Sequence, residues 1–444
     1  MPYTKDNHPN IMYIFTDQQS ANMMSCTGNK YLKTPGMDSL AETGIRFDKA
    51  YCSNPVCLPS RFSMMTGFMP SKLDIRSNDV GWIESVPDDI LNQSMGWLLR
   101  NAGYDTGYGG KVHLPRGMTP ETMGFERITP DQRAGLADSC VEFIQRDRDK
   151  PFFLLASFIN PHDICYMAIR AYQDLNWERL TNELGALNKA LEIPEGISED
   201  EFFDKHCPPL PDNFKPQLNE PEAISMVLDQ RKFKRNAREN WTEEMWRMHR
   251  WAYCRLTEMV DAHIVKVLDA LRDSGQEENT LVIFSSDHGD MDSAHGMEHK
   301  TVLYEEPTRV PLIVSQKGTT PAGMIDNKHL VSNGLDLIPT LCDYAEINPP
   351  ANLSGKSFKS LVEGKDVESW CKHLWIESEF GYMVCGERFK YMLYDEGDNR
   401  EQLMDLEKDP GEMRNWAKDP KYGDILKEYR QHFQNYRSEF LANQ

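Results

Sequence analysis

The sequence predicts an α/β fold, with a large, mostly parallel central sheet flanked by helices and a smaller C-terminal subdomain built on an antiparallel sheet. Two observations predict this fold. Three short apolar runs each end in polar residues, and after about residue 352 the chain changes to alternating short runs with turn residues between them. Near-continuous apolar strands are typical of a sheet covered on both faces. Alternating short runs joined by turns are typical of antiparallel strands.

The three apolar runs are expected to be strands whose ends carry functional residues. They are residues 11–15 before Asp17, residues 152–158 before His162, and residues 281–284 before Asp287. In open α/β sheets, ligands bind outside the carboxyl ends of the strands. We therefore expect these three polar side chains to lie at one end of the sheet.

A long helix is predicted between the second and third runs, over residues 242–274. Glu243 and Glu244 fall in its first turn, apolar residues recur at helical spacing, and Gly275 follows as a stop signal. The preceding segment, about residues 163–240, is expected to be an insertion because it contains a proline-rich irregular stretch. With this insertion, residues 1–351 are expected to form the main domain.

The C-terminal subdomain is expected to cover residues 352–444. Its predicted strands are residues 373–378, 382–385, 389–394 and 402–405, and a helix is expected over residues 422–440. Asp409-Pro410-Gly411 is typical of a turn.

Composition excludes several classes of protein. The 444 residues are 40% hydrophobic, yet no apolar run approaches the roughly 20 residues of a membrane-spanning helix. The net charge of −20 argues against a nucleic-acid partner, because such binding needs a basic face. The N-terminus lacks the apolar core of a signal peptide, so we expect a cytoplasmic protein, or a periplasmic or secreted one whose leader has been removed. The ten cysteines are expected to be mostly reduced and buried.

Cys57-Leu58-Pro59-Ser60-Arg61 is the most informative stretch of the chain. Pro59 suits a first helical turn, so Cys57 is expected at a helix N-terminus, where free N–H groups attract anions. Arg61 adds a planar cationic group one turn further on. The stretch therefore predicts a site for a tetrahedral oxyanion.

With this stretch, the chain resembles the formylglycine-dependent (type I) sulfatases of the alkaline phosphatase superfamily. The resemblance recurs in the family's order along nearly the whole chain. Its blocks are Asn10 to Gln18, Cys57 to Gly67, Gly110-Lys111-Val112-His113, Asn160-Pro161-His162-Asp163, Ser286-Asp287-His288-Gly289-Asp290, the run from His299 to Glu306 around Lys300, and Asp405 to Glu412.

The resemblance implies two cofactors. Cys57 would be oxidised to formylglycine by a maturation enzyme, and one divalent cation would be held by Asp17, Gln18, Asp287 and His288 together with residue 57. Carboxylate and amide oxygens favour calcium or magnesium over zinc, and we expect calcium, with magnesium as the alternative. Gln18 stands where many family members have an aspartate, so the site carries one negative charge fewer.

The resemblance also assigns catalytic roles. The hydrated aldehyde of formylglycine would attack sulfur through one hydroxyl and later expel sulfate through the other. Arg61, Lys111 and Lys300 would stabilise charge, His113 would handle the proton of the hydrate, and His162 with Lys300 would face the leaving oxygen. His295 and His299 match no motif and are expected at the surface.

The predicted function is hydrolysis of a sulfate monoester, with a sulfated carbohydrate or small molecule as substrate and a role in glycan degradation. One alternative is a phosphate or phosphonate monoester hydrolase of the same superfamily. Another is a non-catalytic sulfated-glycan binder in which Cys57 is never converted. The basic cluster formed by Arg231, Lys232, Lys234, Arg235 and Arg238 is expected to be a solvated helix face, and its alternative role is to bind a carboxylate or second sulfate.

Overall fold

The central sheet has eight strands in the order β5, β4, β6, β1, β7, β8, β2, β9. This arrangement comes from a computed structural model that describes residues 8–79, 85–172 and 181–441. Only β8 runs against its neighbours β7 and β2, so the predicted, mostly parallel sheet is confirmed. The strands are β1 (Asn10–Asp17), β2 (Ile45–Phe47), β4 (Asp105–Gly110), β5 (Glu126–Thr129), β6 (Phe152–Pro161), β7 (Thr280–Ser286), β8 (Leu312–Ser315) and β9 (Met324–Asp326).

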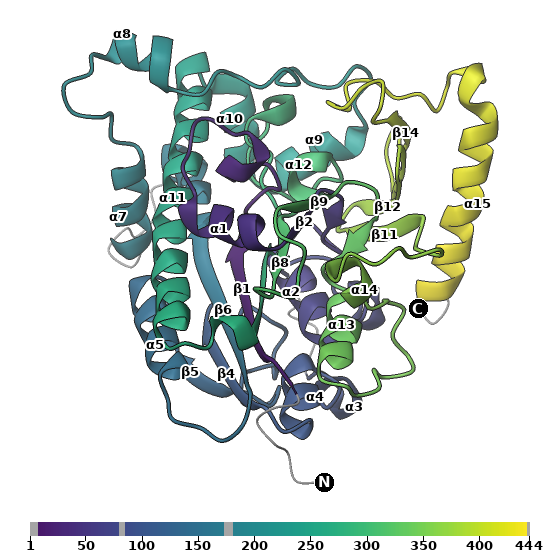
Figure 1. The fold of residues 1–444 in the computed structure, drawn as a ribbon. Coiled ribbons are helices and arrows are strands. Elements are labelled where there is room, and N and C mark those ends of the chain that lie inside the picture. The colour runs from purple at the N-terminus through teal and green to yellow at the C-terminus, as the bar shows by residue number, and fades with distance from the viewer. Residues whose placement is uncertain (1–7, 80–84, 173–180, 442–444) are drawn as a thin grey trace.

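Helices cover both faces of this sheet (Figure 1). Alternate side chains of β1 point to opposite faces: Tyr13 joins a core with α2, α4 and α13, while Ile14 joins a core with α1, α5 and α11. Burial on both faces explains why β1, β6 and β7 are almost uniformly apolar. The helices are α1 (Pro35–Thr43), α2 (Cys57–Thr66), α4 (Met95–Asn101), α5 (Ala134–Ile144), α11 (Glu243–Asp273) and α13 (Leu337–Tyr344).

The long helix α11 matches its prediction closely. The Thr242 hydroxyl accepts a hydrogen bond from the Met245 backbone N–H at 3.3 Å, which caps the helix. Gly275, with φ of 71°, follows the C-terminal cap Ser274 and takes a left-handed conformation that favours glycine. The cap and the stop signal in the sequence therefore set both ends of α11.

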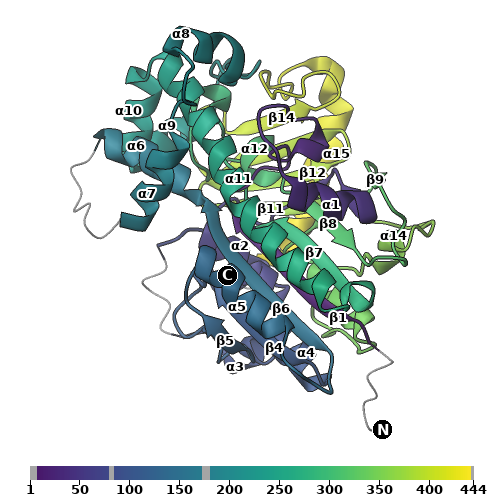
Figure 2. The same cartoon turned by 60° about the vertical axis from the view of Figure 1, so that its left-hand side comes forward.

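Most of the insertion is helical. It contains α6 (Cys165–Tyr172), α7 (Thr181–Ala190), α8 (Glu199–Glu201), α9 (Glu222–Gln230) and α10 (Lys232–Asn240), and its residues 173–180 lie outside the described residues. Helices α6, α7, α9 and α10 gather at one end of the molecule, around the start of α11 (Figure 2). Among the residues described, no helix has the length and apolar character to cross a bilayer.

The C-terminal region forms a separate antiparallel sheet, as predicted. It consists of β11 (His373–Ser378), β12 (Gly381–Gly386), β13 (Phe389–Tyr394) and β14 (Glu401–Asp405). Trp375 and Tyr391 pack on Phe433 of α15 (Gly423–Phe440), while the other face of the sheet packs on α9 and on the chain around residues 291–304. The domain boundary at residue 351 stays a prediction.

Candidate active site

Strand register brings the predicted site residues to one end of the sheet. Thr16 of β1 lies opposite Ser286 of β7, so Asp17 and Asp287 leave the sheet at the same level. Asp17 lies opposite Pro161 of β6, which places His162 beside them. The expected clustering at the carboxyl ends of the strands is therefore what the structure has.

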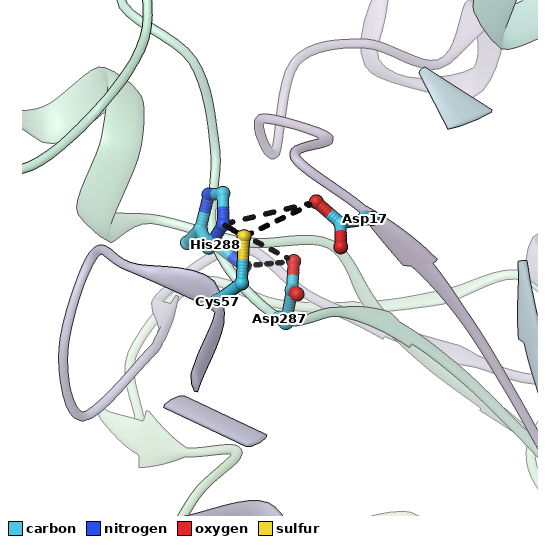
Figure 3. Close-up of side chains that lie close together, drawn as sticks. All are labelled: Asp17, Cys57, Asp287 and His288. Atoms are coloured by element: carbon cyan, nitrogen blue, oxygen red, sulfur yellow. Dashed lines mark hydrogen bonds and ion pairs between the residues drawn. The ribbon is translucent and has the colours of Figure 1, made fainter. Parts of the chain in front are cut away.

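Four buried side chains form the centre of this cluster (Figure 3). Asp17, Cys57, Asp287 and His288 each offer a ligand atom, and these atoms all lie within 4.8 Å of one another. His288 Nε2 lies 3.2 Å from Cys57 Sγ and 3.6 Å from Asp287 Oδ1. Cys57 is the first residue of α2, as the position of Pro59 predicts.

The donor set fits a divalent cation. His288 Nδ1 lies 2.8 Å from the Gly289 carbonyl oxygen, which can only accept, so this contact favours the tautomer that leaves the Nε2 lone pair facing the cluster. Oδ1 of Asp17 and Oδ1 of Asp287 also face it, and both carboxylates are completely buried. Buried carboxylates beside an imidazole suit a cation that takes oxygen ligands.

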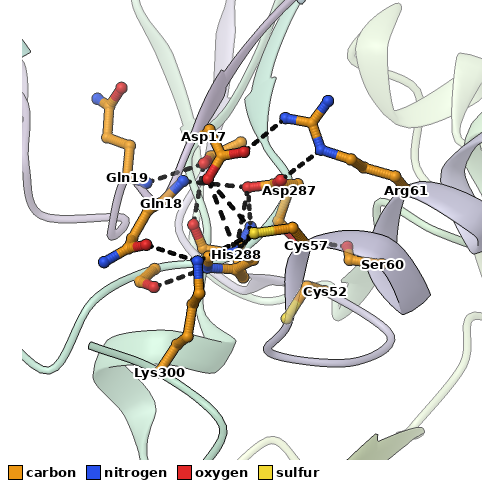
Figure 4. A network of polar contacts seen from close by, with 12 residues as sticks. Asp17, Gln18, Gln19, Cys52, Cys57, Ser60, Arg61, Asp287, His288 and Lys300 are labelled. Atoms are coloured by element: carbon orange, nitrogen blue, oxygen red, sulfur yellow. Dashed lines mark hydrogen bonds and ion pairs between the residues drawn. The ribbon is translucent and has the colours of Figure 1, made fainter. Parts of the chain in front are cut away.

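Arg61 lies behind this cluster and holds its two carboxylates (Figure 4). Its Nε donates to Asp287 Oδ2 at 2.7 Å and its Nη2 donates to Asp17 Oδ2 at 2.8 Å. Its Nη1 donates to the Lys111 carbonyl oxygen and to Ser157 Oγ, each at 2.9 Å. The prediction that Arg61 faces an oxyanion is wrong, because Arg61 is 1% exposed. Its guanidinium group instead orients the carboxylates of Asp17 and Asp287.

Two lysines approach Cys57 from different elements. Lys300 Nζ lies 2.9 Å from Cys57 Sγ, and Lys111 Nζ lies 3.9 Å from Cys57 Sγ and 2.5 Å from Asp17 Oδ2. Burial opposes ionisation of the Cys57 thiol, but the ammonium groups of Lys111 and Lys300 outweigh it and hold the pKa of Cys57 well below its ordinary value. The centre therefore stabilises negative charge at residue 57.

Gln18 makes contacts that the sequence does not predict. Its Oε1 accepts from Lys300 Nζ at 2.6 Å and from Cys165 Sγ at 3.1 Å, while its Nε2 donates to Asp290 Oδ2 at 2.6 Å. Its backbone has φ of 69°, and its carbonyl oxygen accepts from the Tyr253 hydroxyl at 2.6 Å. Gln18 as a metal ligand stays a prediction, because its amide faces Lys300 and Asp290.

Sequence reasoning missed two partners of Gln18. Burial raises the pKa of Asp290 to about 7. The sequence does offer a signal for Asp290, because this residue ends the block from Ser286 that also contains Asp287 and His288. Cys165 carries no comparable signal, because only the fold brings the start of α6 against β1.

His113 and His162 both lie close enough to the Cys57 thiol to interact with it electrostatically. The Nδ1 atom of each is buried and bonds no residue within the described part of the chain. Burial and the Lys111 ammonium lower the pKa of His162 to about 4, so its ring is neutral near pH 7 in this state. The structure thus brings the predicted catalytic residues together around Cys57, with Lys111, His113 and His162 partly exposed.

Two expectations about surface residues are wrong. His295 is completely buried and stacks on Tyr304 at 4.0 Å, and His299 is 6% exposed with its ring 4.9 Å from that of Phe233. Both are buried because the C-terminal sheet and the insertion cover this loop. Lys234, expected on a solvated helix face, is also buried.

Comparison with known proteins decides the family. A family profile described as Sulfatase matches residues 9–347. The chain belongs to the sulfatase family. A second profile, described as N-sulphoglucosamine sulphohydrolase, C-terminal, matches residues 293–439 of this sulfatase and includes its antiparallel sheet.

Relatives of this sulfatase match along almost its full length. A Delta 4,5-hexuronate-2-O-sulfatase of Bacteroides thetaiotaomicron is 30% identical, with 95% of this chain and 87% of the relative covered. A choline-sulfatase of Rhizobium meliloti is 29% identical, with 93% and 83% covered. The solved structure of a 2-O GAG sulfatase superimposes with a TM-score of 0.84 at 28% identity, covering 98% of this chain and 93% of that one. The sulfatase is accordingly a sulfuric ester hydrolase with the fold that the sequence predicts.

Proposed function

We propose that this sulfatase hydrolyses a sulfate monoester of a carbohydrate, using a formylglycine made from Cys57 and one calcium ion. The observation that carries the proposal is the placement of Cys57 Sγ. It lies at the start of α2, between the Lys300 and Lys111 ammonium groups, and beside the donor atoms of Asp17, Asp287 and His288. A nucleophile, a cation site and two charge-stabilising lysines thus meet at one point.

A formylglycine at position 57 and a cation beside it supply the nucleophile and the Lewis acid. Lys111 and Lys300 bind the sulfate oxygens and stabilise the negative charge that grows on them. His113 holds a proton at residue 57, and His162 gives a proton to the bridging oxygen of the departing alcohol. The negative sulfate favours the protonated form of His162, which burial otherwise disfavours.

Arg61 and Lys111 keep the carboxylate of Asp17 in place for the cation. Both donate to Asp17 Oδ2, which leaves Oδ1 directed at the centre. Magnesium is the alternative ion, and reconstitution of metal-stripped protein with each ion, followed by elemental analysis, distinguishes them.

The proposed substrate is a 2-O-sulfated hexuronate derived from a glycosaminoglycan. Two findings support it, the relative with 30% identity across 95% of the chain and the 2-O GAG sulfatase structure with a TM-score of 0.84. A maturation enzyme that oxidises Cys57 is part of the proposal. A periplasmic or secreted location is proposed as well, and cell fractionation would test it.

The direct test measures both the hydrolysis of a sulfate ester and the conversion of Cys57 to formylglycine. Protein produced with a formylglycine-generating enzyme should release sulfate from a sulfated uronide, and mass spectrometry should find the Cys57 peptide converted to the aldehyde. Cys57→Ala should retain the fold and lose turnover, because only a small side chain is removed. Converted protein that cleaves matched aryl phosphates faster than aryl sulfates would support the phosphate or phosphonate alternative. Unconverted protein that binds the sugar without turnover would support the non-catalytic one.

A further inference from the structure

Helix α10 carries a buried lysine that has no partner. Lys234 is 6% exposed, and its ammonium makes no hydrogen bond or ion pair with any residue in the described ranges. The three arginines of the basic cluster all form ion pairs: Arg231 with Asp79, Arg235 with Asp229 and Glu239, and Arg238 with Glu220. Lys234 is thus the member of the cluster that departs from a solvated helix face.

Lys234 lies near the loop that carries His299 and Lys300. Its charge acts on Lys300, which contacts Cys57, and on His299, whose ring packs against Phe233 next to Lys234. Two groups favour the charged form of Lys234: the Cys165 thiol and the carboxylate of Glu379, which accepts a hydrogen bond from Gln230. Within the described residues, Lys234 and Glu379 interact electrostatically without forming an ion pair.

An unpaired ammonium on a side chain as buried as that of Lys234 is costly. Removing a charge from water is unfavourable unless a partner compensates it, and the ammonium of Lys300 adds repulsion. Burial and Lys300 together lower the pKa of Lys234 to about 8. Such uncompensated groups are typical of sites that receive a charged ligand.

The reacting sulfate does not need Lys234. Lys300 and Lys111 already surround Cys57, where that sulfate must lie. An anion at Lys234 is therefore a group other than the reacting sulfate. We propose that Lys234 binds a second anionic group of the sulfated sugar, the carboxylate of the hexuronate, and so selects acidic sugars. The choice of a carboxylate rests on the proposed function, whereas a second sulfate would offer the same negative charge.

Kinetics with matched substrates test this proposal. The enzyme is the converted holoenzyme, and the substrates are a 2-O-sulfated hexuronate, the corresponding 2-O-sulfated hexose without the carboxylate, and a disulfated hexosamine. Lys234→Met keeps the length of the side chain and removes its charge. Lys232→Met is the matched control, because Lys232 is exposed on the same helix.

Lys234→Met should lower kcat/KM for the hexuronate by about 10 to 100-fold, mainly through KM, because a charge-assisted contact is lost. The hexose should lose less than about 3-fold, Lys234→Arg should recover most of the hexuronate activity, and Lys232→Met should match the wild type. Calorimetric binding of the hexuronate to a Cys57→Ala protein, with and without Lys234→Met, should give the same ratio without turnover.

Equal losses on the hexuronate and the hexose would overturn the proposal, as would full hexuronate activity in Lys234→Met. If the wild type cleaves the disulfated hexosamine and the hexose but not the hexuronate, the hexuronate substrate is wrong. In that case, a larger loss of kcat/KM in Lys234→Met on the disulfated hexosamine than on the hexose would still support Lys234 as the site of a second anion. Equal losses on the two sugars would reject that role. If Lys234→Met unfolds, Lys234→Gln replaces it in both measurements.

Discussion

Replacing Arg61 should both destabilise the protein and disorganise its cation site. Arg61→Met removes the guanidinium but retains most of the side-chain volume, so it leaves Asp17 and Asp287 buried without their shared partner. Breaking a buried ion pair from one side costs about 3–5 kcal/mol. Asp287 loses its Arg61 partner here, Asp17 loses one of two partners and keeps its ion pair with Lys111, and the hydrogen bonds to Ser157 and to the Lys111 carbonyl are lost as well. We expect the upper end of that range, about 5 kcal/mol.

The variant Arg61→Lys distinguishes the effect of the positive charge at position 61 from the effect of the planar guanidinium group. A lysine at this position restores a positive charge but cannot present the planar fork that reaches both carboxylates, so we expect it to recover about half of the lost stability. Activity should fall about 10 to 100-fold even in the lysine variant, as for other residues that orient metal ligands.

Urea unfolding of chelated protein, followed by circular dichroism, measures the change in the free energy of unfolding. Arg127→Met is the control, because its pair with Glu121 lies at the surface with side-chain exposures of 33% and 56% and should contribute about 0–1 kcal/mol. The reasoning is refuted if Arg61→Met loses less than about 1 kcal/mol, or if it matches Arg127→Met in stability and the wild type in activity.

Three further predictions concern the site. Chelation should abolish sulfate release and added calcium should restore it, and full activity in protein shown by elemental analysis to lack metal would contradict the cation site. His162→Ala should reduce kcat/KM about 100 to 10,000-fold for alkyl sulfates but far less for aryl sulfates, whose phenolate leaves without a proton; equal losses would remove His162 from the acid role. Gly110→Ala should destabilise the protein by about 1–3 kcal/mol and displace Lys111, because the added Cβ would lie 2.1 Å from the Ser157 carbonyl oxygen. The control Gly117→Ala has a similar φ of 92° with open space around it, so it should lose less, and equal thermal shifts in the two variants would exclude the steric argument.

The sequence by itself determined three strands of the central sheet, the four strands of the C-terminal sheet, the long helix and the candidate residues of the site. Burial on both faces makes β1, β6 and β7 apolar along their length, and a polar residue marks the end of each, so a local pattern locates Asp17, His162 and Asp287. The caps of α11 are likewise local signals. The motif around Cys57 indicated the chemistry, because the spacing of Pro59 fixes where the helix begins.

Only the tertiary structure decided which side chains face the centre and which support it. Arg61 looked like an anion-binding group from its position in α2, but two carboxylates at the ends of β1 and β7, 44 and 226 residues away, accept its hydrogen bonds. Lys234 and Arg235 are neighbours with the same charge in the sequence, yet Lys234 is buried and Arg235 pairs with Asp229 at the surface. Charge and spacing along the chain do not encode these differences, because burial and pairing depend on elements that meet only when the sheet, the insertion and the C-terminal region pack together.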